Sequence, residues 1–293
     1  MKAIFKRELR ALMGGLRGWG YVAIMLLGAG ASVFLLNYLN LSTRFEAGIN
    51  YIALFLIPAT IAAATDSFQT DRRQNTERML FSLPVKTADI VLGKLLAHLV
   101  PVAVTGAALC AFPLILSVYG PIGWAAALSG VLALTVLGAV MMSVGLCMSA
   151  CSKNRFIAVL AIAAVLAASW AAPMAADLIR SRGSLTPMMM ACFMLVGFTA
   201  TYLMSNSALA GILVAAMIEV PVLLHYLNGT GAELMQTIGN SVDSVNLFAG
   251  LNPFINGLMD SGVLIGWLAV VALFALITML VIGNRRQAKR RAL

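Results

Sequence analysis

The chain has 293 residues, of which 61% are hydrophobic and only 11% are charged, and its mean hydropathy is +0.94. Soluble domains carry about 25% charged residues, so this composition excludes a soluble globular protein and predicts an all-α integral membrane protein. The net charge of +9 would raise nucleic acid as a partner of a soluble protein. Here the placement of the charges, given below, explains it as membrane topology, and we expect no nucleic acid.

Residues 1–17 are predicted to form an amphipathic helix that lies at the membrane interface. Apolar residues recur there at helical spacing between four basic ones, Lys2, Lys6, Arg7 and Arg10. Such a segment favours anionic headgroups. The first predicted span, residues 18–39, follows and is interpreted as an uncleaved anchor.

Seven further apolar runs are long enough, or nearly so, for the roughly 20 residues that a transmembrane helix needs. They cover residues 48–65, 90–118, 124–150, 156–176, 187–204, 208–227 and 262–283. Only Ser205, Asn206 and Ser207 separate the runs 187–204 and 208–227, which are therefore either two spans or one re-entrant hairpin. The sequence thus predicts a helical bundle of eight spans, or of six spans plus a hairpin. In this scheme residues 177–261 supply additional helices and an external segment, and residues 284–293 form a basic tail.

The run 156–176 is rich in alanine. Ala158, Ala161, Ala164 and Ala168 fall on one side of a helix, and small residues at such spacing let helix backbones approach closely. This side is therefore predicted to pack against protein.

The basic residues predict the orientation. If the N-terminus is cytoplasmic, 17 of the 20 lysines and arginines fall in cytoplasmic segments, and only Arg44, Arg180 and Arg182 lie outside. Cytoplasmic loops carry an excess of such residues. Both termini are therefore predicted to be cytoplasmic, and so is the connection between the second and third spans.

That connection, residues 66–89, is the most charged part of the chain between two spans. Residues 66–94 hold nine charges and are predicted to lie outside the bilayer. Thr76, Met79, Leu80 and Leu83 follow the i, i+3, i+4, i+7 spacing of a helix with one apolar face. Pro84 would end this helix, Thr87 would cap the next span, and Asp89 would lie in its first turn. A solvated surface loop is the alternative reading of the same residues.

The stretch TDRRQNTERMLFSLPVKTADIVLGKLLA resembles the region after the second span of ABC-2 type permeases, in particular their gliding-motility-like branch. Asp71 stands where that family often has Glu, and Asn75 stands where it usually has Gly. The N-terminal IFKRELRAL, the run Ser152-Lys153-Asn154 and the late segment PFINGLMDSGVLIGWLAVVALF are also similar to the family. The matching residues of the long stretch are Thr76, Glu77, Leu80, Ser82, Pro84, Val85, Ile90, Val91, Gly93 and Lys94.

The resemblance implies that residues 1–293 form one ABC-2 type transmembrane domain of a multi-pass protein in a bacterial cytoplasmic membrane. Residues 66–89 would then contain the coupling helix, which docks on a cytoplasmic ABC ATPase dimer. A second permease subunit, identical or related, would complete the transporter. The residues implied in ATPase coupling are Asp71, Arg72, Arg73, Thr76, Glu77, Arg78, Leu80 and Pro84.

The chain itself is predicted not to be an enzyme and to hold no cofactor or metal. Its Gly93-Lys94 pair is followed by Leu95, and Ala88 stands where a P-loop has its first glycine. ATP and Mg²⁺ would therefore bind to the partner ATPase. The family resemblance implies a permease that exports an amphiphilic or apolar substrate.

Two other functions fit part of the sequence. Glu219 is an acid inside a predicted span, and ionisable groups within the membrane often mark transport pathways. A secondary transporter that uses Glu219 is one alternative, although such proteins favour several midplane ionisable groups. The other is a membrane scaffold whose charged insert recruits a cytoplasmic partner.

Overall fold

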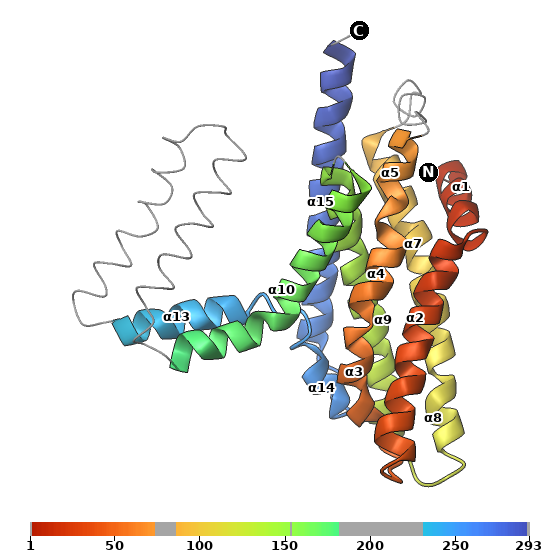
Figure 1. The fold of residues 1–293 in the computed structure, drawn as a ribbon, viewed down its shortest axis with the longest axis vertical. Coiled ribbons are helices and arrows are strands. Elements are labelled where there is room, and N and C mark those ends of the chain that lie inside the picture. The colour runs from red at the N-terminus through yellow and green to blue at the C-terminus, as the bar shows by residue number, and fades with distance from the viewer. Residues whose placement is uncertain (1, 74–85, 153, 182–230, 292–293) are drawn as a thin grey trace. The chain divides into compact units, whose positions relative to one another are not determined.

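The computed structural model describes residues 2–73, 86–152, 154–181 and 231–291 (Figure 1). The chain divides into two compact units, one of residues 1–168 with 247–293 and one of residues 169–246. In the described residues the regular secondary structure is helical, without a strand. The prediction of an all-α fold is therefore confirmed for this part of the chain.

The first unit is a bundle of long apolar helices preceded by the short helix α1, Lys2–Met13. Five segments are long and apolar enough to cross a membrane, namely Leu16–Tyr38 (α2 and the π-helical η1), Thr87–Leu116 (α7 and α8), Trp124–Cys151 (α9), Arg155–Asp177 in α10 and Ser261–Gln287 in α15. A sixth is bent by 42° where Phe45–Leu54 (η2 and α3) meets Leu56–Arg73 (α4 and α5). In full, α10 is Arg155–Ser181 and α15 is Ser261–Arg291, and the short helix α14, Leu251–Ile255, precedes α15.

These six segments coincide with six of the predicted spans, with ends that differ by up to a few residues, except that the second span runs on through the short helices at both of its ends. The runs 187–204 and 208–227, and with them Glu219, lie outside the described residues. The total of eight spans therefore stays a prediction.

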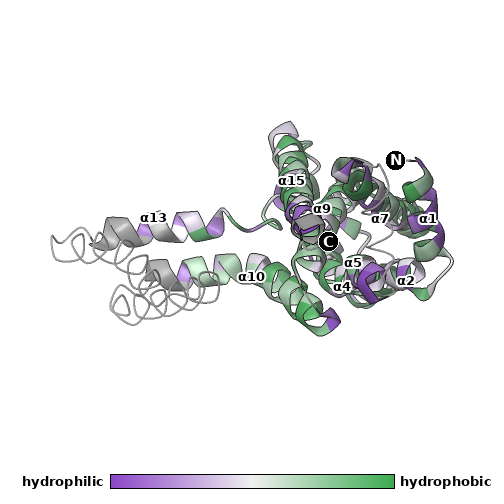
Figure 2. Ribbon diagram, turned by 90° about the horizontal axis from the view of Figure 1, so that it is seen from above, coloured by the Kyte–Doolittle hydropathy of each residue, from purple (hydrophilic) through white to green (hydrophobic). Residues whose placement is uncertain are grey.

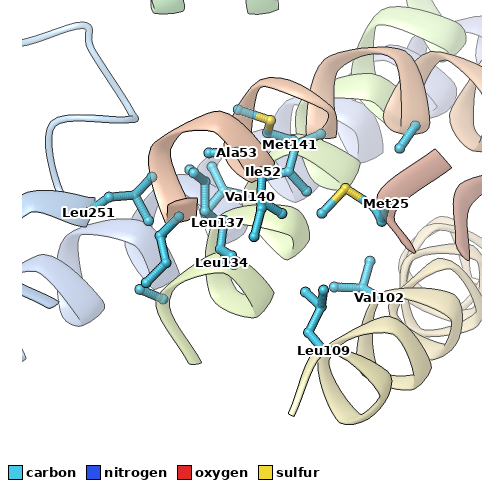
Figure 3. Packing of buried hydrophobic residues seen from close by; sticks show 14 of the residues in the cluster. Met25, Ile52, Ala53, Val102, Leu109, Leu134, Leu137, Val140, Met141 and Leu251 are labelled. Carbon is cyan, nitrogen blue, oxygen red and sulfur yellow. The ribbon is translucent and has the colours of Figure 1, made fainter. Parts of the chain in front are cut away.

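The central helix is α9. Inside the protein, 72% of its apolar stretch is buried, against 22% for α15. Glycines bring its neighbours close: a Cβ added at Gly138 would lie 2.8 Å from the Tyr21 hydroxyl of α2 and 3.1 Å from Val102 Cγ1 of α7. Leu134, Leu137, Val140 and Met141 of α9 pack there against Ile52 and Ala53 of α3 and Met25 of α2 (Figure 3).

One local prediction about a helix end is corrected, and one about a helix face stays open. Helix α7 is Thr87–Leu109, and its N-cap is Lys86, without a side-chain capping bond, so Thr87 is the first helical residue rather than the cap; Asp89 does lie in the first turn. In the first unit the buried face of α10 carries Ala158, Ile162 and Leu166, whereas Ala164 and Ala168 are exposed. Of the four alanines, Ala158 is buried, Ala161 is half-buried and the other two are exposed, so the prediction that this side packs against protein stays a prediction.

More of the charged connection, residues 66–94, is buried than the sequence predicts. Helix α5, Asp66–Arg73, follows α4, Leu56–Ala64, after Thr65 alone, and Ser67, Phe68 and Gln69 are buried. At the other end, Lys94 is buried within α7. The part of residues 66–94 that could be fully surrounded by water is therefore shorter than the charge pattern predicts.

In the second unit the described residues are the end of α10 and the helix α13, Gly231–Asp243, with the turn that follows it. The Ser169 hydroxyl donates a hydrogen bond to the carbonyl of Val245, 3.0 Å away, which ties these two segments together.

Candidate functional site

Charged side chains from several helices meet at one end of the first unit, where the chain enters and leaves the insert. Figure 2 views the molecule from above, from the side of this end. In this view α1 carries both hydrophilic and apolar residues. Three contacts at this end hold α5 and the start of α7, the two helices that flank residues 74–85. They are a buried lysine, a capped helix end and a carboxylate shared by two arginines.

Lys94, in the second turn of α7, is the centre of the first contact. Its ammonium group lies 2.9 Å from Glu8 Oε1 of α1 and 2.8 Å from Asp71 Oδ2 of α5. It also donates to the carbonyl of Ser67, 2.8 Å away, and lies 5.0 Å from the centre of the Phe68 ring. The side chain is 1% exposed. A buried ammonium is tolerated only when it is paired and hydrogen-bonded, and here acids from two different helices pair it.

Arg7 joins the same two acids from the outer side. Its guanidinium is 2.6 Å from Glu8 Oε1 and 3.4 Å from Asp71 Oδ1. Burial lowers the pKa of Arg7, but its hydrogen bond to Glu8 and the charges of Asp71 and Glu8 raise the pKa, and the net pKa lies above its ordinary value. Arg7 therefore stays charged, and two cations balance two carboxylates in one network that joins α1, α5 and α7.

Helix α1 lies on α7 through small and apolar contacts as well. A Cβ at Gly93 would be 3.1 Å from Ile4 Cγ2, so the missing side chain lets α1 approach the turn that carries Lys94. Leu12 is buried on the same helix. The prediction that residues 1–17 lie at the membrane interface remains a prediction, but the apolar face of α1 is used at least in part within the protein.

The second contact caps the C-terminal end of α9 with side chains of α5. Arg72 donates to the carbonyls of Ser152 and Ala150, the latter at 2.6 Å. Gln69 Nε2 donates to the carbonyls of Ser149 and Ser152 at 3.1 and 3.0 Å, and the Ser149 hydroxyl donates back to the carbonyl of Thr65 at 2.8 Å. The last carbonyls of a helix lack partners within it and favour cations. These bonds therefore fix α5 against α9.

In the third contact, Asp66 lies between two arginines, each in the first turn of a segment long and apolar enough to cross a membrane. Arg17 Nε of α2 is 3.6 Å from Asp66 Oδ2, and Arg155 Nε of α10 is 3.2 Å from Asp66 Oδ1. Arg17 also donates to the Thr70 hydroxyl at 3.1 Å. At the same end of the bundle, Arg285 of α15 donates to the carbonyl of Cys151 at 2.9 Å.

The residues predicted to couple to an ATPase divide between described and undescribed parts. Asp71 and Arg72 are described, and the structure engages both within the chain, while Arg73 is exposed. Thr76, Glu77, Arg78, Leu80 and Pro84 lie outside the described residues. The coupling role of all eight remains a prediction.

Sequence reasoning missed Glu8 and the burial of Lys94. The one signal available was that Lys94 follows three apolar residues and Gly93 inside a span-like run, where an unpaired ammonium would be unfavourable. In the described part of the chain, moreover, no group of three His, Cys, Asp or Glu side chains could hold a metal ion. The absence of a cofactor from the chain stays an expectation.

The fold and this site define a multi-pass α-helical membrane protein with a charged connection that neighbouring helices hold at both of its ends. A family model described as "ABC-2 family transporter protein" matches residues 23–208. The chain therefore belongs to the ABC-2 family of transporter proteins, the membrane permeases of ABC transporters, as the resemblance predicted. No curated protein matches the chain, and no solved structure does.

Proposed function

We propose that this chain is the transmembrane permease subunit of an ABC exporter and that a separate ATPase drives it. The ATPase would dock on the coupling segment within residues 66–89, and ATP and Mg²⁺ would bind on that partner. The supporting observation is the network around Lys94, because it joins α5 and α7, which are the two helices that flank residues 74–85.

This network offers a mechanical path from the insert to the membrane. A force applied to residues 74–85 reaches α5 and α7 at their ends. Asp71 is paired with Lys94, and Arg72 is bonded to the end of α9, so the flanks of the insert cannot move independently of the bundle. In this proposal the ATPases close and open, and the spans change access from one side of the membrane to the other.

A second permease subunit would complete the pathway. The exposed alanines Ala164 and Ala168 of α10 present a small-residue surface, which suits close packing of membrane helices. The substrate proposed from the family resemblance is amphiphilic or apolar, and the direction is export from the cytoplasm.

The test is purification of the full chain from its native membrane in a mild detergent, with mass spectrometry of the chains that stay bound. The variant carries Glu77→Ala with Leu80→Asp in the coupling segment. The control carries Arg44→Gln, in the connection between the first and second membrane-crossing segments. We expect an ATPase subunit to copurify with the wild type and the control and to be lost from the variant. Transport activity without any nucleotide-binding subunit would contradict the proposal and would favour a secondary transporter, whereas a bound partner without ATPase activity would favour a scaffold.

A further inference from the structure

Among the described residues, Arg17 and Arg155 share Asp66, Arg17 also donates to Thr70, and part of their hydrogen-bonding capacity is left unused. The side chain of Arg155 is 62% exposed, and its described contact is through Nε alone. The 3.6 Å between Arg17 Nε and Asp66 Oδ2 is too long for a hydrogen bond. In the part of the chain that the structure describes, Asp66 is the one carboxylate within ion-pair distance of either arginine, so the three residues together carry an excess positive charge.

Both arginines lie at the start of segments that are long and apolar enough to cross a membrane. Arg17 is the second residue of the membrane-crossing segment Leu16–Tyr38, and Arg155 is the first residue of Arg155–Asp177. Both segments continue with large exposed apolar side chains: Leu16 and Trp19 on α2 are 90% and 54% exposed, and Phe156 and Leu160 on α10 are 73% and 54% exposed. The Trp19 indole N–H donates to the carbonyl of Met13 at 2.8 Å, so its polar edge faces the helix end.

We propose that Arg17 and Arg155 bind the phosphate of an anionic phospholipid, with its acyl chains against the exposed apolar residues of α2 and α10. A guanidinium forms charge-assisted hydrogen bonds with phosphate oxygens, often in a bidentate manner. Basic sites between membrane helices on the cytoplasmic side suit such headgroups. A second anion beside Asp66 would balance the excess charge, and the lipid tails would cover apolar surface that the chain itself leaves open. The proposal does not depend on an ATPase partner.

The experiment measures lipid binding to the purified full chain in detergent by native mass spectrometry. Phosphatidylglycerol, phosphatidylcholine with the same acyl chains, and inorganic phosphate are titrated separately. The variant is Arg17→Gln with Arg155→Gln. The control, Arg44→Gln with Lys86→Gln, removes the same number of charges at residues that are exposed.

We expect the variant to bind phosphatidylglycerol at least about tenfold more weakly than the wild type does, a factor equivalent to about 1.4 kcal/mol. The control should retain wild-type affinity, and phosphatidylcholine should bind weakly to all three proteins. Equal affinity of variant and control for phosphatidylglycerol would overturn the proposal. If inorganic phosphate binds as tightly as the lipid, the site is one for free anions and the assignment to a lipid is wrong.

Asp66→Asn keeps the proposal testable if the double arginine variant does not fold. Because Asp66 competes with the phosphate for both guanidiniums, its neutralisation should strengthen phosphatidylglycerol binding several-fold. Unchanged or weaker binding by Asp66→Asn would also overturn the proposal.

Discussion

Lys94 brings together residues that are far apart in the sequence. Its ammonium pairs with Glu8 and Asp71, and Arg7 reaches across 64 positions to the same Asp71. At a buried site such pairs matter mainly through the penalty of breaking them, because removal of one partner leaves uncompensated charge. The residues of this network are therefore expected to be far more sensitive to substitution than charged residues at the surface.

We predict that Lys94→Met lowers the free energy of unfolding by about 3 kcal/mol, at the lower end of the range for a broken buried pair, because Arg7 still faces both acids. The matched control is Lys86→Met, a change at the exposed N-cap residue of α7, which should leave stability nearly unchanged. Unfolding is followed by SDS titration in detergent micelles. Equal stabilities of the two variants would show that the network contributes little.

Arg72 and Arg73 are adjacent arginines, so alanine substitution of the first can be compared directly with alanine substitution of the second as its control. Arg72→Ala removes the bonds to the carbonyls of Ala150 and Ser152 and should destabilise the protein by about 2 kcal/mol, as expected for hydrogen bonds from a charged group. Arg73 is exposed, so Arg73→Ala should change stability by no more than about 0.5 kcal/mol. The same SDS titration measures both variants, and a larger effect of Arg73→Ala would contradict the observed capping of α9.

At this scale the sequence predicted where charge is concentrated but not what each charge contacts. Asp71 and Arg72 were singled out for ATPase coupling, a role that stays a prediction, and their contacts with α7 and α9 have no local signature. Glu8 belongs to an amphipathic pattern in which an acid usually faces solvent. Its burial depends on Gly93, which admits α1 close to α7, and such long-range packing is not encoded in periodicity.

Among the helices, α9 is the one on which the others pack, and its glycines set how closely they approach. A Cβ at Gly145 would lie 2.8 Å from Ala64 Cβ and 2.9 Å from Thr60 Cγ2, both of α4. Distances below 3.0 Å require a shift, and Ala64 is a rigid methyl group fixed to a buried helix. Here a small residue is required by a neighbouring helix and not by backbone conformation.

We therefore predict that Gly145→Ala destabilises the protein by about 1–3 kcal/mol through overpacking. Gly266→Ala on α15 is the control, because nothing lies within 4 Å of the added Cβ, and alanine favours a helix over glycine by about 1 kcal/mol. Thermal unfolding in detergent should show opposite signs for the two substitutions. Destabilisation by both would mean that helix packing at Gly145 is not the cause.

The elements were well predicted where the apolar runs are long, because the requirement for backbone hydrogen bonds in lipid leaves only the helix. Their ends were less accurate. Helix α7 begins at Thr87 and not after it, and α5 prolongs α4 beyond the apolar run, because protein contacts at Phe68 and Gln69 sustain a helix that hydropathy alone would end. The prediction that the alanine side of α10 packs against protein stays a prediction, because Ala158 is buried whereas Ala164 and Ala168 are exposed.

Across the whole first unit, the segments predicted to be cytoplasmic come together. Arg17, Asp66 and Arg155 are in contact, Lys94 is paired with Glu8, and Arg285 bonds to Cys151. One end of the bundle thus holds the start of the chain, α5 with the start of α7, the turn before α10 and the end of α15. The basic-residue count predicts that this end faces the cytoplasm.

Labelling of single cysteines tests this orientation. In a background without the four native cysteines, Arg44→Cys and Lys86→Cys place one thiol each at an exposed position. A membrane-impermeant maleimide should label Arg44→Cys in intact cells and Lys86→Cys only after the membrane is permeabilised. The reverse pattern would invert the predicted topology.

The pairing of α1 with α7 also constrains the order of events during synthesis. Glu8 leaves the ribosome long before Lys94, on the order of ten seconds earlier at 5–20 residues per second. During that interval Glu8 lacks the ammonium group of Lys94, and α1 lacks the glycine surface of α7. Its amphipathic pattern allows α1 to bind at the membrane surface during this time. The N-terminal helix therefore completes its tertiary contacts only after α7, the third membrane segment, has been inserted.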